Sequence, residues 1–433
     1  MNDFMIWLPL VICVAMFLLN FPVYSCLLVP GIFYFVFIST DLDVGICFQR
    51  IAVATENFPL MAVPFFVMAG EIMNYAGISS RMMNFARMCV SRFTGGLAQV
   101  NVLLSALMGG VSGSSLADCA NECKILVPDM VKDGYPKNFS TALSAITSIV
   151  TPIIPPGISL IMYAFYANCS VGDLFLAGYI PAIIIVACLM FTVWFLSKRN
   201  NWGTKSDRHY SVKEWLLAVK DSIWALIMPI GLLGGMRIGL FTATEGGAMC
   251  VLYASVIGLF VYREMKISDF KEIIISSAKS TASILIIVGC AAALGYYLSW
   301  EAIPQRVTEL LLGISTNKYV ILLIINIFLL IIGMFMEGNV VTVLILPLLL
   351  PILGEVGINI VHFGILYSVN GLIGACTPPF GTVMFTACQT TGITVKEYTK
   401  AALPLFAAAI VALAIITYIP ALSLFLPSIF GGA

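Results

Sequence analysis

The sequence predicts an all-α protein that crosses a membrane many times, and three observations support this prediction. Of the 433 residues, 60% are hydrophobic and 10% are charged, against about 25% charged in a typical soluble chain. The mean hydropathy is +1.02. Apolar stretches of bilayer-spanning length recur along the whole chain, and several of them are interrupted by Pro-Pro or Gly-rich segments.

The apolar stretches give the expected membrane helices. A hydrocarbon core about 30 Å thick needs about 20 apolar residues of helix. About ten stretches meet this length: 4–20, 23–40, 58–78, 138–166, 173–197, 222–239, 243–262, 280–299, 360–390 and 400–427. The first of them is expected to stay in the mature chain, because it lacks the basic start of a cleaved signal and the apolar run continues too far.

Two longer stretches, 94–131 and 317–354, could each cross twice, but both have Gly and polar residues at their centres. We interpret each as a re-entrant helical hairpin that returns to its own side. Two full crossings would leave the basic residues on the same sides, so the charges do not distinguish the two topologies. The Gly-rich polar centres favour the hairpins. Most basic residues then face the cytoplasm, and both termini face the opposite side. The exceptions among the 22 are Arg50, Arg237, Arg306 and Lys318.

The two halves of the chain resemble each other at nearly constant spacing. Pro155-Pro156 precedes Pro378-Pro379 by 223 residues, and Gly113 precedes Gly338 by 225. By the topology above the two copies are inverted, and inverted repeats with interrupted helices are typical of secondary transporters. We expect N-terminal scaffold helices over 1–60, a first repeat over 61–220 and a second over 221–433. Their broken spans are 138–166 and 360–390.

The first interruption is the run Gly109-Gly110-Val111-Ser112-Gly113-Ser114-Ser115. Bare backbone at membrane depth is tolerated where it lines a cavity, and serine hydroxyls and free carbonyls are ligands that suit a small hard cation. A close-packed face of small residues is the alternative interpretation.

The other interruptions are 151–157, Glu337-Gly338-Asn339 and 377–381. Prolines remove backbone donors and free carbonyls one turn earlier. Broken helices present carbonyls to cations at one end and N–H groups to anions at the other. One hairpin and one broken span per repeat therefore suggest at least two cation sites flanking one substrate.

Ionisable residues inside the spans are costly and are therefore candidates for function. Glu337 lies at the second interruption, and Glu71 lies in 58–78, where a position at the membrane boundary is the alternative. For Glu245 the alternative is a helix cap. We expect four residues to contact substrate: Asp118, Glu245, Ser114 and Asn339.

Several classes of function are excluded. The chain has 22 basic and 22 acidic residues, which argues against nucleic-acid binding. It has no GxxxxGK[ST] motif for ATP and no HExxH motif, and its two histidines lie far apart, so neither an ATP-driven pump nor an enzyme is expected. The twelve cysteines are interpreted as buried apolar residues.

With these motifs in hand, the sequence resembles the large membrane (M) subunit of tripartite ATP-independent periplasmic (TRAP) transporters, of the DctM-like and sialic-acid type. The resemblance covers nearly the whole chain. The segments that carry it are VPFFVMAGEIM from Val63, SGSSLAD from Ser112, VPDMVKDGYP from Val127, IIPP from Ile153, GLFTATEGG from Gly239, GMFM from Gly333 and GACTPPFG from Gly374.

The resemblance implies a sodium symporter of the bacterial inner membrane that works by an elevator motion. In that membrane the topology above puts both termini in the periplasm. It implies two partners, a small membrane subunit of about four helices and a soluble periplasmic substrate-binding protein. It also implies about two or more sodium ions as coupling ions. The residues that match the family's sodium sites are Ser112, Gly113, Ser115, Thr151, Ile154, Pro156, Glu337, Gly338, Thr377, Pro379 and Gly381.

The expected function is sodium-coupled uptake of an organic acid with a carboxylate, of the sialic acid or C4-dicarboxylate class. Proton coupling through Asp118 or Glu337 is the alternative. The chain departs from the family pattern at Glu337, where Asp is usual, and at Gly157, where Ser is usual. The first change lengthens the reach of a charge, and the second falls beside the expected substrate contacts.

Overall fold

The computed structural model describes residues 3–19, 21–39, 42–56, 58–90, 93–203 and 211–430. Within them every regular element is helical, as predicted. The N-terminal helices are α1 (Asp3–Leu18), α2 (Val23–Phe33), α3 (Val44–Thr55) and α4 (Ala62–Tyr75), with a π-helical turn at Tyr34–Ile38 and a 3-10 turn at Phe58–Met61.

Two series of six helices follow the same order. Each has a short helix, two hairpin arms, the two halves of a broken span and a long helix. The first series is α5 (Ile78–Val90), α6 (Gly96–Ser112), α7 (Ser115–Lys132), α8 (Lys137–Thr147), α9 (Ile158–Ala167) and α10 (Val171–Asn200). The second is α14 (Ile303–Ile314), α15 (Lys318–Gly333), α16 (Gly338–Glu355), α17 (Ile360–Cys376), α18 (Thr382–Thr391) and α19 (Val395–Tyr418).

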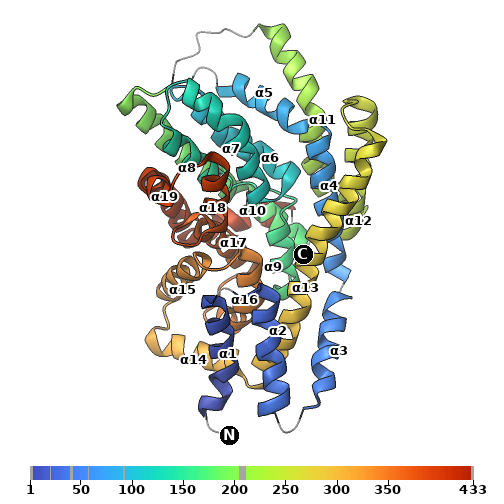
Figure 1. Cartoon of the computed structure of the whole chain (residues 1–433), viewed down its shortest axis with the longest axis vertical. Coiled ribbons are helices and arrows are strands. Elements are labelled where there is room, and N and C mark those ends of the chain that lie inside the picture. The colour runs from blue at the N-terminus through green and yellow to red at the C-terminus, as the bar shows by residue number, and fades with distance from the viewer. Residues whose placement is uncertain are drawn as a thin grey trace.

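The remaining helices connect and flank the two series. They are α11 (Val212–Arg237), α12 (Ala243–Val256), α13 (Phe270–Trp300) and α20 (Ala421–Phe430), with a π-helical turn at Ile257–Val261 and a 3-10 turn at Ile267–Asp269. Figure 1 shows α5 to α8 in the upper half and α14 to α16 in the lower half, while α13 runs through most of the height. In the core α18 packs against α7, and α9 packs against α16, so each broken span reaches the hairpin of the other series.

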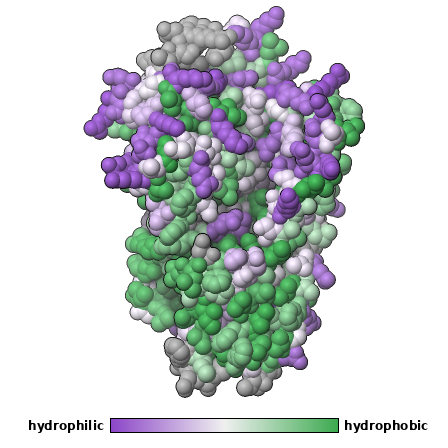
Figure 2. Space-filling view, viewed as in Figure 1, coloured by the Kyte–Doolittle hydropathy of each residue, from purple (hydrophilic) through white to green (hydrophobic). Residues whose placement is uncertain are grey.

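The basic residues gather at one end of the molecule. Their clusters lie on α5, the end of α7, the start of α8 and the end of α10, and all of these segments lie at the upper end in Figure 1. Figure 2 shows the same end as hydrophilic and the lower half as largely apolar. Since basic residues mark the cytoplasmic side, we refer to this as the basic end.

By length and composition, six helices among the described residues can cross a membrane, or seven if the bent pair α14–α15 counts as one span. The expected spans 4–20 and 23–40 are present as shorter apolar helices, and 58–78 contains the 14-residue helix α4. The spans 138–166 and 360–390 are broken as expected, into α8 and α9 and into α17 and α18. The hairpins 94–131 and 317–354 correspond to α6–α7 and α15–α16.

Three features differ from the expected spans. Helix α11 begins ten residues before the expected 222, because Ser211 and Glu214 form a capping box at its start. Helix α13 begins at Phe270 rather than 280. The expected span 400–427 ends early at Tyr418, and Pro420, which has no N–H to continue a helix, separates α19 from α20.

Candidate functional site

The first hairpin turns through only two residues. Helix α6 ends at Ser112, Gly113 adopts a left-handed conformation (φ 57°), and Ser114 caps α7 by accepting a hydrogen bond from the Ala117 amide at 3.4 Å. A side chain at Gly113 would place its Cβ 2.4 Å from the Pro156 carbonyl oxygen. Glycine is therefore required on two counts, and the first tip (Ser112–Ser115) lies directly against the broken span of its own series.

The second hairpin turns at Met334–Glu337, and Glu337 is the N-cap residue of α16. Asn339 donates a hydrogen bond to Glu337 at 3.3 Å, which holds the carboxylate at the second tip (Glu337–Asn339). Gly333 and Gly374 meet where α15 packs on α17, with the ideal Cβ of Gly374 only 2.7 Å from Gly333 backbone atoms. This crossing needs two glycines.

Both broken spans contain tight, carbonyl-lined loops. Between α8 and α9 a side chain at Gly157 would meet the Pro152 carbonyl oxygen at 1.8 Å. Between α17 and α18 a side chain at Gly381 would meet the carbonyl oxygens of Ala375 at 2.5 Å and Thr377 at 2.7 Å. Each loop thus packs backbone oxygens against a glycine that leaves no room for a side chain.

The two tips line one cavity of about 570 Å³. Helices α4 and α13 form its opposite wall, through residues such as Asn74, Ser280 and Ser283. Seven of the predicted site residues line it: Ser112, Gly113, Ser114, Ser115, Glu337, Gly338 and Asn339. The structure therefore brings together residues more than 200 positions apart in the sequence.

The other predicted sodium-site residues lie outside the lining. Pro156 lies behind the first tip against Gly113, and Ile154 packs against Gly109, whose ideal Cβ is 2.6 Å from the Ile154 Cβ. The second-repeat residues Thr377, Pro379 and Gly381 belong to the loop between α17 and α18.

Asp118 is also behind the first tip. Its side chain is 1% exposed, and it accepts a hydrogen bond of 2.6 Å from Thr151, whose hydroxyl also lies 3.1 Å from the Ser105 carbonyl oxygen. The carboxylate therefore ties α7 to the broken span rather than facing the cavity.

Sequence reasoning missed a second buried carboxylate. Glu122, one turn after Asp118 on α7, is 2% exposed and accepts hydrogen bonds from Ser105 at 2.8 Å and Thr147 at 3.2 Å. Thr147 also lies 2.8 Å from Asn101. The i, i+4 spacing of two acidic residues beside the first tip was the available signal.

The first tip has oxygen atoms suited to a hard cation. Ser112 Oγ is buried and has no hydrogen-bond partner, and the loop carbonyls lie nearby. An unpartnered buried hydroxyl is costly unless something binds it. Among the described residues no group of three His, Cys, Asp or Glu forms a metal cluster, so a cation here would be held mainly by neutral oxygens, as small monovalent ions can be.

Two further candidates behave differently from each other. Glu245 is exposed and forms a capping box with Thr242 at the start of α12, so the structure gives it the capping role that was the alternative interpretation, and it does not line the cavity. Glu71 does line the cavity, and it accepts a hydrogen bond from Ser276 of α13 at 2.9 Å.

Lys279 also lines the cavity and was not predicted from the sequence. The predicted topology places it on the cytoplasmic side, since it is not among the four exceptions, but α13 begins at Phe270 and carries Lys279 roughly 14 Å along its axis, to the cavity wall. The polar positions Ser276, Lys279, Ser280 and Ser283 on one face of an otherwise apolar helix were the available signal.

Comparison with known proteins agrees with this architecture. The model of the family described as "Tripartite ATP-independent periplasmic transporter, DctM component" matches residues 10–422. The sialic acid TRAP transporter large permease protein SiaM of Vibrio cholerae is 34% identical over 92% of this chain and 93% of its own. The C4-dicarboxylate TRAP transporter large permease protein DctM of Rhodobacter capsulatus is 32% identical over 96% and 98%.

Among solved structures, the YdaH transporter of Alcanivorax borkumensis superposes with a TM-score of 0.66 over 95% of this chain and 98% of its own. At 14% identity this likeness shows the fold alone. The apolar helices of the present chain and its TRAP permease relatives indicate a multi-pass protein of the inner membrane. The chain belongs to the DctM family, the large permease component of tripartite ATP-independent periplasmic transporters.

Proposed function

We propose that the chain carries out sodium-coupled uptake of an organic acid that bears a carboxylate. The observation that supports this most strongly is the cavity that both tips line. Each tip combines a helix N-terminus with neighbouring carbonyl and hydroxyl oxygens, so cations and an anion can be held side by side.

Charge accounts for the coupling. The ionisable side chains that line the cavity are Glu71, Glu337 and Lys279, two carboxylates and one ammonium group. Without bound cations this lining opposes an anion. Two sodium ions at the tips reverse the sign, so that the anion binds only after them. Each sodium ion that enters down 100 mV supplies about 2.3 kcal/mol.

An elevator motion fits the arrangement. The hairpins and broken spans form one interlocked unit, because α18 packs on α7 and α9 on α16. Helices α4 and α13 form the facing wall.

Two partners follow from the family's tripartite character: a small membrane subunit of about four helices and a periplasmic substrate-binding protein. The relatives named for sialic acid and for C4-dicarboxylates suggest the substrate range. The basic end would face the cytoplasm and the start of α1, at the lower end in Figure 1, the periplasm.

The test uses proteoliposomes that contain this chain with its small subunit, supplied with the binding protein and labelled organic acids. Uptake should require a sodium gradient and the binding protein together. Uptake that persists in sodium-free buffer at the same pH would refute sodium coupling.

Proton coupling is the second candidate, and the buried pair Asp118 and Glu122 favours it. Neither carboxylate has a basic partner among the described residues, and both belong to the wall of the first tip. A pH gradient that drives uptake without sodium, and fails to do so in Glu122→Gln, would support this candidate over the first.

A further inference from the structure

Lys279 is the one basic residue in the cavity lining formed by the described residues. It is exposed, and within the described part of the chain it forms neither an ion pair nor a side-chain hydrogen bond. Long basic side chains of membrane proteins usually reach water or a partner. This one faces a cavity with its charge unneutralised.

Glu71 lies on the same wall but does not neutralise Lys279. Its Oε1 accepts a hydrogen bond of 2.9 Å from Ser276, three residues before Lys279 on the same face of α13. The carboxylate is thereby held one turn away from the ammonium group. Lys279 remains available to a ligand, and Glu71 places a fixed negative charge beside it.

Apart from Glu337 at the second tip, the rest of the polar lining is neutral and rich in hydroxyl and amide groups. It comes from both tips, from α4, α9, α13 and from the start of α18. They include Asn74, Ser159, Ser280, Ser283, Asn339 and Thr382. Such groups both donate and accept hydrogen bonds, as the hydroxyls of a ligand require.

We propose that Lys279 pairs with the single carboxylate of a hydroxylated monocarboxylic acid, and so makes the cavity select this class over dicarboxylates. The inference rests on the proposed function and narrows its substrate. A dicarboxylate would bring a second negative charge into a lining with one ammonium group, where Glu71 opposes it. The hydroxyl groups of a polyhydroxy acid instead form hydrogen bonds with the neutral hydroxyl and amide groups of the lining. A dicarboxylate would leave those groups without partners.

Direct binding tests this without the binding protein's own selectivity. The full chain with its small subunit is placed in lipid nanodiscs, in sodium chloride or choline chloride. Equilibrium binding is measured for radiolabelled D-gluconate and N-acetylneuraminate, which are hydroxylated monocarboxylates, and for succinate. The variants are Lys279→Gln, Lys279→Arg and the matched control Lys271→Gln, an exposed lysine on the same helix outside the cavity lining. Melting temperature is recorded for each.

In sodium, at least one of the hydroxylated monocarboxylates should bind more tightly than succinate. Lys279→Gln should weaken that binding at least about ten-fold, as loss of a charge-assisted hydrogen bond does, with an unchanged melting temperature. Lys279→Arg should keep most of the affinity, and Lys271→Gln all of it.

Tighter binding of succinate, or equal loss in the Lys279 and Lys271 variants, would overturn the proposal while leaving sodium coupling intact. If no acid binds in a sodium-dependent manner, the proposed function itself fails, and with it the inference.

Discussion

Ser112 Oγ, at the end of α6 where the first hairpin turns, is buried without a hydrogen-bond partner. A cation bound at the first tip would explain why this hydroxyl has no partner in the protein. Because the hydroxyl has no protein partner, its removal should cost the sodium-free protein little, whereas a buried hydroxyl with a partner would cost about 1 kcal/mol.

We therefore predict that Ser112→Ala leaves the melting temperature unchanged in choline chloride but reduces the rise that sodium produces. Sodium stabilises the protein in proportion to ln(1 + [Na⁺]/Kd), so a weaker site gives a smaller rise. Ser105→Ala is the contrasting control, since Ser105 donates to buried Glu122 and its loss should destabilise the protein in both salts. Equal sodium-induced rises in Ser112→Ala and the unmodified protein would remove Ser112 from the site.

Gly113 is constrained both by its backbone conformation and by the broken span beside it. Gly113→Ala combines a left-handed backbone with a contact of 2.4 Å to the Pro156 carbonyl oxygen. Gly134→Ala has a comparable backbone (φ 89°) but nothing within 4 Å of the new Cβ. Backbone strain alone costs about 1 kcal/mol or slightly more, so both variants should fold. Only Gly113→Ala should lose most of its sodium-dependent uptake, because the first tip is displaced from the broken span. Equal uptake by both variants would contradict this.

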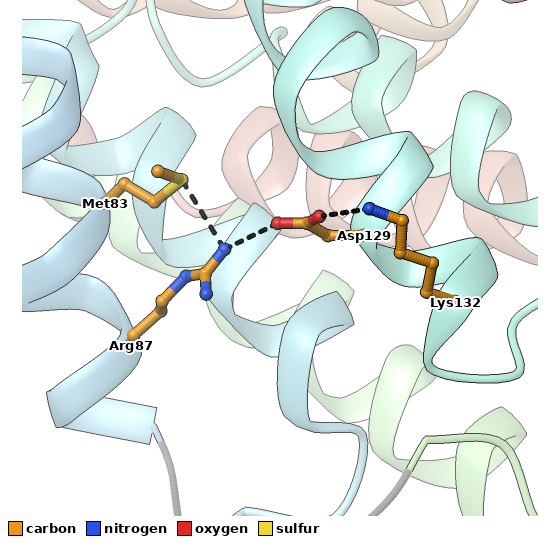
Figure 3. Close-up of polar contacts among 4 residues, drawn as sticks. All are labelled: Met83, Arg87, Asp129 and Lys132. Atoms are coloured by element: carbon orange, nitrogen blue, oxygen red, sulfur yellow. Dashed lines mark hydrogen bonds and ion pairs between the residues drawn. The ribbon is translucent and has the colours of Figure 1, made fainter.

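Among the elements, α5 is tied to the first hairpin by charge. Figure 3 shows Met83 and Arg87 of α5 facing Asp129 and Lys132 of α7. The Arg87 guanidinium lies between Met83 and the Asp129 carboxylate, and Lys132 lies on the other side of that carboxylate. The Arg87–Asp129 distance is 2.9 Å and the Lys132–Asp129 distance 3.7 Å, and Lys132 is 78% exposed.

Arg87→Gln should therefore lower stability by no more than about 1 kcal/mol, since the pair is partly exposed, and Lys132→Gln should lower it less. The difference between Arg87→Gln and the unmodified protein should shrink between 0.05 M and 0.5 M salt, because salt screens the pair. Thermal unfolding in detergent at both salt concentrations measures this. A loss that is independent of salt would show that Arg87 acts through packing.

The second repeat depends on the closeness of α15 and α17. Gly374→Ala forces a Cβ to within 2.7 Å of Gly333 backbone atoms, which cannot move aside as a side chain can. We expect a loss of about 1–3 kcal/mol. Gly371→Ala, one turn earlier on the same helix with nothing within 4 Å, should be nearly neutral or slightly stabilising. Chemical unfolding compares the two, and similar losses would argue against a glycine-dependent crossing.

At the scale of the whole molecule, the sequence predicted the spans and interruptions well, because apolar length and Pro or Gly breaks act locally. The hairpins and both broken spans fall where their motifs lie. The sequence did not predict α3, α5 and α14, which are short and carry polar residues, or the early starts of α11 and α13, which depend on caps and surface turns.

The candidate site was predicted only in part for a similar reason. The tips could be located because Gly-Ser and Glu-Gly-Asn runs interrupt apolar helices. Lys279 could not be located in this way, because its depth along α13 depends on where the helix begins. Asp118 faces Thr151 rather than the cavity because the tertiary packing of α7 on the broken span decides its direction.

The central claim is that the two tips form one substrate site that works only with bound cations. Its most direct test is hydrogen–deuterium exchange of the full chain with its small subunit in nanodiscs, with and without sodium. Sodium should slow exchange at both tips together, around residues 109–117 and 334–341, and Ser112→Ala should weaken this effect. If exchange at the tips is the same in sodium and in choline, the tips do not form a cation-dependent site.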